Sequence, residues 1–427
     1  MRNLRVDNRF LLFLFFIMFC VVEISDLLVP YRAQRSGVNS LFTYYSVFSF
    51  VFLGLVLSCF VRFSINVHLP DAIAAERITD LVLFISLAAL CLVLYDRIFI
   101  QGVDYSQGIA HAREMWRVLA TERGGASSAF NVVGNLLFPF VFFSVGYCVL
   151  FFESTLKLRR NFYFSIGLVF VFSAITGGRE LLLVLFGVFF SSLALRFAVG
   201  LPVFAKIMKR DFFIVFFMAS FFAVYVGYLR SQSYDFGMDE YAKSLATRLG
   251  AAEEKIDGLG AYTPDVILPV LIYLAHVKWE FVNTIAHDGS GGLSTFRQLF
   301  KMLLEYLSLS FDWVDYKSPS YSPNWISLVG SVYYDLGWIG VLLYSLGLAL
   351  SPFVFFVLFS VKEFNKVGFS ISLYLFLCAV IVFSPFAFLF EVVQFIYFLV
   401  FIVIVFFVSF IPVRNYRDMR SYESRIH

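Results

Sequence analysis

The sequence predicts an all-α polytopic membrane protein in which residues 1–427 form a single integral membrane domain. Two observations predict this class. The composition is 60% hydrophobic, 20% aromatic and only 15% charged, whereas a soluble globular protein is about half apolar and a quarter charged. The apolar residues also occur in runs of about twenty between short charged segments, which is the length of a helix that crosses a bilayer.

Each predicted span is a helix of about 20 residues, because a rise of about 1.5 Å per residue then covers a hydrocarbon core of about 30 Å. About ten segments fit: residues 10–29, 41–61, 79–97, 129–152, 161–177, 180–199, 211–229, 338–360, 368–388 and 391–411. The first resembles a signal peptide, but its apolar run is too long and no small-residue cleavage site follows. We therefore expect an uncleaved first helix.

The basic residues predict the orientation of these spans. One set of short connections contains most of the basic residues: Arg2, Arg5, Arg9, Arg62, Arg77, Lys157, Arg159, Arg160, Arg196, Lys206, Lys209, Arg210, Lys362, Lys366, Arg414, Arg417, Arg420 and Arg425. The short connections on the other side contain only Arg32, Arg35 and Arg179. Because short cytoplasmic loops are enriched in Lys and Arg, both termini are predicted to be cytoplasmic.

Two long connections then fall on the outer face, at residues 98–128 and 230–337. Within the second, residues 265–287 are long enough for an eleventh span. Four residues interrupt this run: Pro269, His276, Lys278 and Glu280. Because another crossing would also put the basic C-terminus on the wrong side, we expect a helix on or over the membrane surface, followed by an amphipathic helix at residues 294–311.

Charge and cysteine usage exclude several classes of partner. A net charge of +3 is too small to suggest a nucleic-acid partner. All five cysteines lie within apolar runs, and no CxxC or Cys/His spacing occurs, so neither a disulfide framework nor a zinc site is expected. The outer loops contain no carboxylate pair typical of a divalent-metal site. We expect no metal and no cofactor.

A tight turn with two glycines and an arginine joins the fifth and sixth spans, at residues 173–181 (SAITGGREL). Free backbone N–H groups, the positive end of the new helix dipole and the Arg179 guanidinium converge there, which suits a phosphate. The alternative is that Arg179 only anchors the helix at the headgroups and pairs with Glu180 or a lipid phosphate.

Further arginines occur in the outer loops. Arg113 and Arg117 are one turn apart on a predicted helix, and Arg230 ends the seventh span at the depth of Arg179. Since a guanidinium presents five donors in a fixed fork, several arginines at one interface suit a pyrophosphate. Arg113, Arg179 and Arg230 are the candidate pyrophosphate ligands, although most surface arginines have no such role. The outer loops also contain Arg97, Arg123, Arg248 and Arg297.

The candidate catalytic residues are His276 and Asp335. His276 precedes Glu280 by four residues, so its imidazole could act as a general base that the carboxylate orients; the alternative is a histidine at the membrane interface. Asp335 lies at the predicted headgroup level, where a carboxylate needs a partner or a function. Residues 321–340 are too long for one straight crossing with the next span, so one of their glycines is expected to bend the helix.

Glu23 and Asp26 are three residues apart near the outer end of the first span. They could face the bundle interior, where a transporter would use them as a proton or cation site. The simpler expectation is that both are hydrated at the membrane boundary.

Three stretches resemble the O-antigen polymerases of Gram-negative bacteria, the Wzy family of oligosaccharide repeat-unit polymerases. The first is VDYSQGIAHAREMWRVLATERGGASSAFNVVGNLLFPFVF, an early outer loop that continues into the fourth span. The second is the small-residue-plus-arginine turn TGGRE, and the third is SPNWISLVGSVYYDLGWIGV, a Tyr-Asp-x-Gly entry into a late helix. The likeness covers most of the chain as architecture rather than as sequence.

The resemblance implies a GT-C-like architecture of the polymerase and ligase type in the bacterial inner membrane, and inverting glycosyl transfer at its periplasmic face. A glycan on undecaprenyl pyrophosphate would move onto the next lipid-linked repeat unit, and lipid pyrophosphate would leave. His276 or Asp335 would be the base, and the arginines would hold pyrophosphate. The implied partners are the lipid-linked oligosaccharide, membrane lipid, and a chain-length regulator and flippase of the same pathway.

Two other functions fit parts of the pattern. An O-antigen ligase has a related architecture and would transfer the glycan to lipid A-core instead. A lipid-linked oligosaccharide flippase or other transporter is the non-enzyme alternative, and it would normally show charged or broken segments at mid-membrane in matched positions of two halves. Here the charges gather at the outer interface, which argues against a transporter and leaves both polymerase and ligase open.

Overall fold

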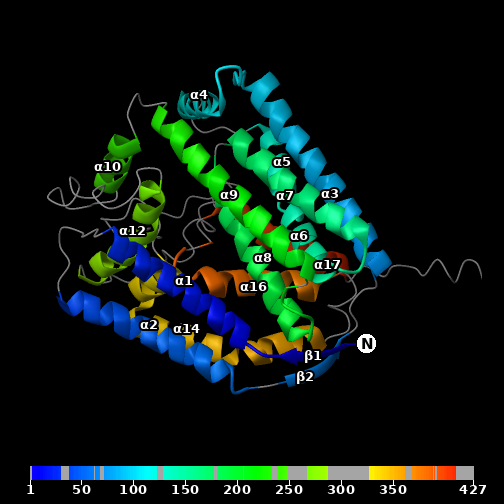
Figure 1. Cartoon of the computed structure of the whole chain (residues 1–427), viewed down its shortest axis with the longest axis vertical. Coiled ribbons are helices and arrows are strands. Elements are labelled where there is room, and N and C mark those ends of the chain that lie inside the picture. The colour runs from blue at the N-terminus through cyan, green and yellow to red at the C-terminus, as the bar shows by residue number, and fades with distance from the viewer. Residues whose placement is uncertain are drawn as a thin grey trace, which may run out of the picture.

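The computed structural model is a bundle of helices with one small two-stranded sheet (Figure 1). The structure describes residues 2–29, 38–61, 63–67, 72–122, 128–176, 178, 180–204, 206–232, 238–248, 267–286, 327–360, 368–387, 389 and 392–409. The amphipathic helix predicted at residues 294–311 therefore lies outside the described residues.

Every apolar run predicted to span the membrane coincides with a helix or a pair of consecutive helices. The elements follow the chain in this order: β1 (Arg2–Val6), α1 (Arg9–Leu28), α2 (Val38–Ser58), β2 (Phe63–Val67), α3 (Ala72–Tyr95), the π-helical turn η1 (Asp96–Ile100), α4 (Ile109–Glu122), α5 (Ala129–Leu137), α6 (Phe140–Leu150), α7 (Leu156–Thr176), α8 (Glu180–Ala198), α9 (Lys206–Gln232), α10 (Met238–Arg248), α12 (Leu268–Ala286), α14 (Leu328–Ser360), α16 (Phe369–Phe383) and α17 (Val393–Ser409).

Seven of the described helical segments are long and apolar enough to cross a membrane: α1, α2, α3 with η1, α5 with α6, α7, α8 and α14. Helices α16 and α17 are shorter apolar helices, and α9 contains the run predicted at residues 211–229. By length and composition the chain is a helical, multi-pass membrane protein, as the sequence predicts.

Helices α6, α8 and α16 form the centre of the bundle, and residues 141–150 of α6 are all buried. Lipid tails are as apolar as leucine, so helices in a bilayer associate mainly through close packing, which small residues permit. A Cβ on Gly146 would collide with Leu375 of α16. On the periphery, a Cβ on Gly54 of α2 would collide with the backbone carbonyl of Ser345 in α14. Gly54 thus sets the spacing between α2 and α14, because the clash there would be with backbone atoms.

One short strand pair, which the sequence did not predict, accompanies the helices. β1 pairs with β2 in antiparallel register, with Leu4 opposite Ile65, and ties the N-terminus to the connection between α2 and α3. Each strand has only five residues, so a search for apolar runs of about twenty residues passes over them.

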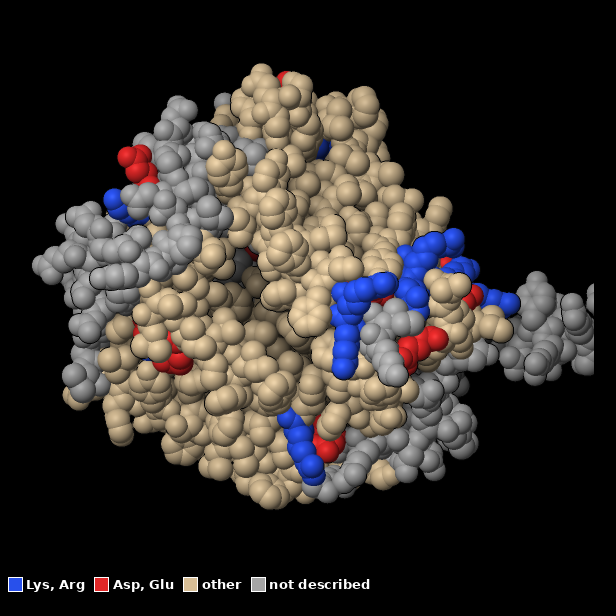
Figure 2. Space-filling view, viewed as in Figure 1, with Lys and Arg blue, Asp and Glu red and all other residues tan. Residues whose placement is uncertain are grey.

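Basic side chains gather at one end of the described bundle, which we call the basic end (Arg9, Arg77, Lys157, Arg160 and Lys209). They lie in the first two turns of α1, α3, α7 and α9, and Figure 2 shows this concentration on one side of the molecule. We call the other end, near η1, α4, α10 and α12, the outer end (Figure 1). This asymmetry matches the pattern of the positive-inside rule.

Candidate functional site

Helix α12 packs against α1 and α2 near the outer end (Figure 1). Pro269 is its second residue, where a missing N–H breaks no helical hydrogen bond. Residues 275–282 are all buried, including His276, Lys278 and Glu280. The prediction of a helix here is confirmed. Its charged side chains are packed inside the protein rather than exposed, and its position on or over the membrane surface stays a prediction.

Lys278 is the centre of a buried network, which we call the lysine cluster (Lys278, Glu23, Asp26, Tyr45 and Trp279). The Lys278 Nζ lies 2.7 Å from Glu23 Oε2 and 2.9 Å from Asp26 Oδ2, and it donates to the Tyr45 hydroxyl at 2.9 Å. Tyr45 donates to Glu23 Oε2 at 2.9 Å, and the Trp279 indole donates to Asp26 Oδ1 at 2.5 Å. The cluster joins α1, α2 and α12.

The groups around Lys278 hold its side chain in the charged form. Burial by itself lowers the pKa of Lys278, but its hydrogen bonds to Glu23, Tyr45 and Asp26 outweigh burial and raise that pKa above its ordinary value. Lys278 therefore stays charged throughout the neutral range.

The sequence led us to expect that Glu23 and Asp26 are hydrated at the membrane boundary, and the structure contradicts this. Their side chains are only 21% and 13% exposed and face Lys278 rather than bulk water. Two carboxylates against one ammonium hold α12 to α1 across more than 250 residues of sequence. The arrangement locks α12, with His276, onto the first two helices.

His276 is only 1% exposed, two residues before Lys278. Its Nδ1 lies 2.6 Å from the backbone carbonyl oxygen of Tyr273. A carbonyl oxygen only accepts, so Nδ1 carries the hydrogen and, in a neutral ring, Nε2 keeps the lone pair. That is the tautomer a general base needs, although a substrate can reach Nε2 only if the surrounding helices open.

Asp335 lies close to the bend of α14. Gly337 interrupts α14 with a φ of 58°, a left-handed conformation that favours glycine, so the predicted bend is confirmed. Asp335, two residues earlier, is 8% exposed. The Tyr333 ring lies 5.8 Å from the Phe281 ring of α12. Asp335 and His276 therefore belong to neighbouring helices.

A second polar site forms where α3 ends. η1 turns the chain so that Arg97 is only 4% exposed, with its guanidinium 4.3 Å from the centre of the Trp116 ring in α4. Arg97 Nη1 and the Tyr105 hydroxyl both donate to the carbonyl of Ile175, at 3.5 Å and 3.1 Å. Ile175 lies in the last turn of α7, so the first outer loop is fastened to the end of α7, directly before the TGGRE turn in the sequence.

Neighbouring contacts fix this site in place. The Asp96 carboxylate accepts hydrogen bonds from Gln101 and from Ser128, the residue that caps α5. Arg97 Nε has no hydrogen-bond partner among the described residues. π-helical turns occur frequently at functional sites. Arg97 was not among the predicted ligands, and its only signal in the sequence is an arginine placed directly after an apolar run.

The structure describes only some of the three predicted pyrophosphate ligands, Arg113, Arg179 and Arg230. Arg113 is half-buried in α4, which packs against α7 and α9. Arg230 lies in the last turn of α9, but its side chain is outside the described residues, as is the whole of Arg179. The described backbone thus brings the elements that carry Arg97, Arg113 and Arg230 to the outer end.

Figure 2 shows a hollow between the positions of α9 and α12 in the face that it presents. No group of three or more His, Cys, Asp or Glu among the described residues is placed to hold a metal ion. No protein-family model, curated protein or solved structure significantly matches this chain.

Proposed function

We propose that this chain is a glycosyltransferase of the inner bacterial membrane that polymerises oligosaccharide repeat units carried on undecaprenyl pyrophosphate. The observation that carries the proposal is the buried Arg97 site, which fastens the first outer loop to the end of α7, directly before the turn that contains Arg179 in the sequence. A fixed guanidinium beside that turn suits the pyrophosphate group that leaves in such a reaction.

In the proposed reaction, a sugar hydroxyl of the acceptor repeat unit attacks the anomeric carbon of the lipid-linked donor. The new C–O bond forms as the bond to pyrophosphate breaks, and the anomeric configuration inverts. The hydroxyl proton passes to a base, for which His276 and Asp335 are the candidates, and undecaprenyl pyrophosphate leaves with the bonding electrons. Arg97, Arg113, Arg179 and Arg230 would stabilise its charge.

The lysine cluster favours a second candidate, a proton- or cation-coupled transporter, because transporters place such charges inside the bundle. Its position argues against this function. Asp26 lies two residues before the end of α1, which is about 3 Å along the helix, and Glu23 lies about halfway between that end and the middle of the helix. The described contacts of the cluster join three helices, which is what a structural ion-pair network does.

The proposal is tested by reconstituting purified protein in nanodiscs with an undecaprenyl-pyrophosphate-linked repeat unit. We expect products longer by whole repeat units, with one undecaprenyl pyrophosphate released for each unit added. Arg97→Gln should reduce the rate at least 100-fold. Arg77→Gln removes the same charge from the basic end of the same helix and should leave the rate unchanged.

Because Arg97 is buried, the unfolding midpoint of each variant is measured beside its rate. A folded Arg97→Gln protein with the wild-type rate would remove Arg97 from the site. Wild-type protein that moves the lipid-linked unit across the bilayer without extending it would replace the polymerase with a flippase.

A further inference from the structure

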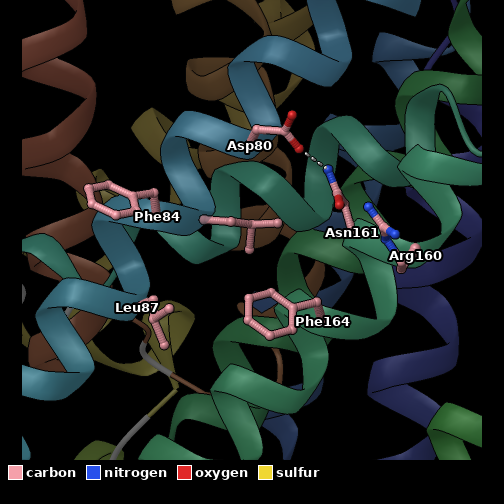
Figure 3. Close-up of a pocket in the computed structure, with 7 residues that line it drawn as sticks. Asp80, Phe84, Leu87, Arg160, Asn161 and Phe164 are labelled. Carbon is pink, nitrogen blue, oxygen red and sulfur yellow. Dashed lines mark hydrogen bonds between the residues drawn. The ribbon is translucent and has the colours of Figure 1, made fainter.

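A groove lies between α3 and α7 at the basic end, away from the outer site (Figure 3). Its volume is about 290 Å³. The polar part is formed by Asp80, Asn161 and Arg160. Apolar side chains line the remainder, which runs from there toward the middle of both helices. The groove thus has a polar head region and an apolar tail region.

The charge of Asp80 is already neutralised. Lys157 Nζ lies 2.5 Å from Asp80 Oδ2, and Asn161 Nδ2 donates to Asp80 Oδ1 at 2.8 Å. Asn161 also donates to Thr79 at 3.1 Å, which fixes its side chain. Arg160 is exposed and forms no ion pair with any carboxylate that the structure describes. The head region therefore presents a guanidinium that is available to an anion.

The tail region faces outward along the helices. Phe84 and Leu87 follow Asp80 by four and seven residues on α3, and Phe164 follows Arg160 by four residues on α7, so each set shares one helical face. All three apolar side chains are substantially exposed. From Asp80 to Leu87 the groove follows α3 for about 10 Å. In a membrane this surface meets acyl chains rather than water.

We propose that this groove binds one anionic phospholipid from the leaflet at the basic end. Arg160 holds the phosphate, whose planar recognition by a guanidinium is strong and directional. One acyl chain lies over Phe84, Leu87 and Phe164. The charge complementarity with Arg160 selects an anionic lipid. This site is independent of the glycosyltransferase activity proposed above.

The test is native mass spectrometry of the full-length protein released from nanodiscs that contain phosphatidylglycerol and phosphatidylcholine. Wild-type protein should retain one phosphatidylglycerol in preference to phosphatidylcholine. Arg160→Gln should weaken that binding about fivefold, which is the value of one basic residue near an anionic headgroup. Lys209→Gln removes an exposed charge at the same end, outside the groove, and should bind as wild type does.

Leu87→Trp supplies a second variant, because it fills the tail region without changing any charge. It should reduce retention of phosphatidylglycerol, and an excess of inorganic phosphate should not displace the lipid from wild-type protein. Equal loss in Arg160→Gln and Lys209→Gln would show only a general attraction to the basic end and would overturn the proposal. So would equal retention of both lipids, or wild-type retention by both groove variants.

Discussion

Lys278→Met is the variant that tests the lysine cluster most sharply. It keeps the length and apolar body of the side chain but removes the ammonium from two carboxylates that are 21% and 13% exposed. Removing one partner of a buried ion pair costs about 3–5 kcal/mol, because the remaining charge is left uncompensated. Since Tyr45 and Trp279 still donate to the carboxylates, we expect a loss near the lower limit, about 3 kcal/mol.

The assay is reversible unfolding in mixed micelles by SDS titration, followed by tryptophan fluorescence, since Trp279 belongs to the cluster. Lys209→Met, an exposed lysine on α9, is the matched control and should stay within about 0.5 kcal/mol of wild type. Adding Glu23→Gln and Asp26→Asn to Lys278→Met removes the unpaired charges and should restore most of the loss. A single variant as stable as the control, or a triple variant no more stable than the single one, would refute the reasoning.

Four further predictions follow from the fold and the site. A periplasm-active reporter fused after Arg117 or Arg248 should be active, and one fused after Arg160 or Lys206 inactive; the opposite pattern would reverse the orientation. Gly54→Ala should destabilise the protein by about 1–3 kcal/mol in the same SDS titration, because its Cβ meets the Ser345 carbonyl, whereas Gly167→Ala, which has open space, should not; equal effects would contradict the close α2–α14 packing. Because its partners raise the pKa of Lys278 above the ordinary value of about 10.4, the stabilisation by its charge is complete below that value and is lost only as pH rises through the folded-state pKa. The difference in unfolding free energy between wild type and Lys278→Met should therefore stay constant from about pH 7 to pH 9, and a decline within that window would contradict the raised pKa. His276→Ala should slow turnover of the lipid-linked substrate more than it weakens donor binding, and an unchanged rate would remove His276 from the reaction.

The membrane-spanning helices could be predicted because the bilayer imposes a length on each one. An apolar run of about 20 residues has few other structures available to it. The bend in α14 was also predictable, since residues 321–340 are too long for a straight crossing and contain glycines, and Gly337 takes the left-handed conformation. These are local properties, and each depends only on residues that are neighbours in the chain.

The contacts that build the sites could not be predicted in the same way. Lys278 pairs with Glu23 and Asp26 only because α12 packs on α1, and no pattern within either segment states which helix faces which. Arg97 is likewise defined by Trp116 and Ile175, which lie on other elements. A charge near the end of an apolar run is compatible with both hydration and burial, so only the packed structure decides between them.

The proposed function is tested most directly by deleting the gene in its source organism and separating the surface polysaccharide by gel electrophoresis. A polymerase predicts that the ladder of long glycan chains collapses to a single repeat unit on lipid A-core, and that wild-type protein supplied in trans restores the ladder. Complete loss of glycan from lipid A-core would instead indicate a ligase, and accumulation of lipid-linked units facing the cytoplasm would indicate a flippase. An unchanged ladder would contradict the proposed function outright.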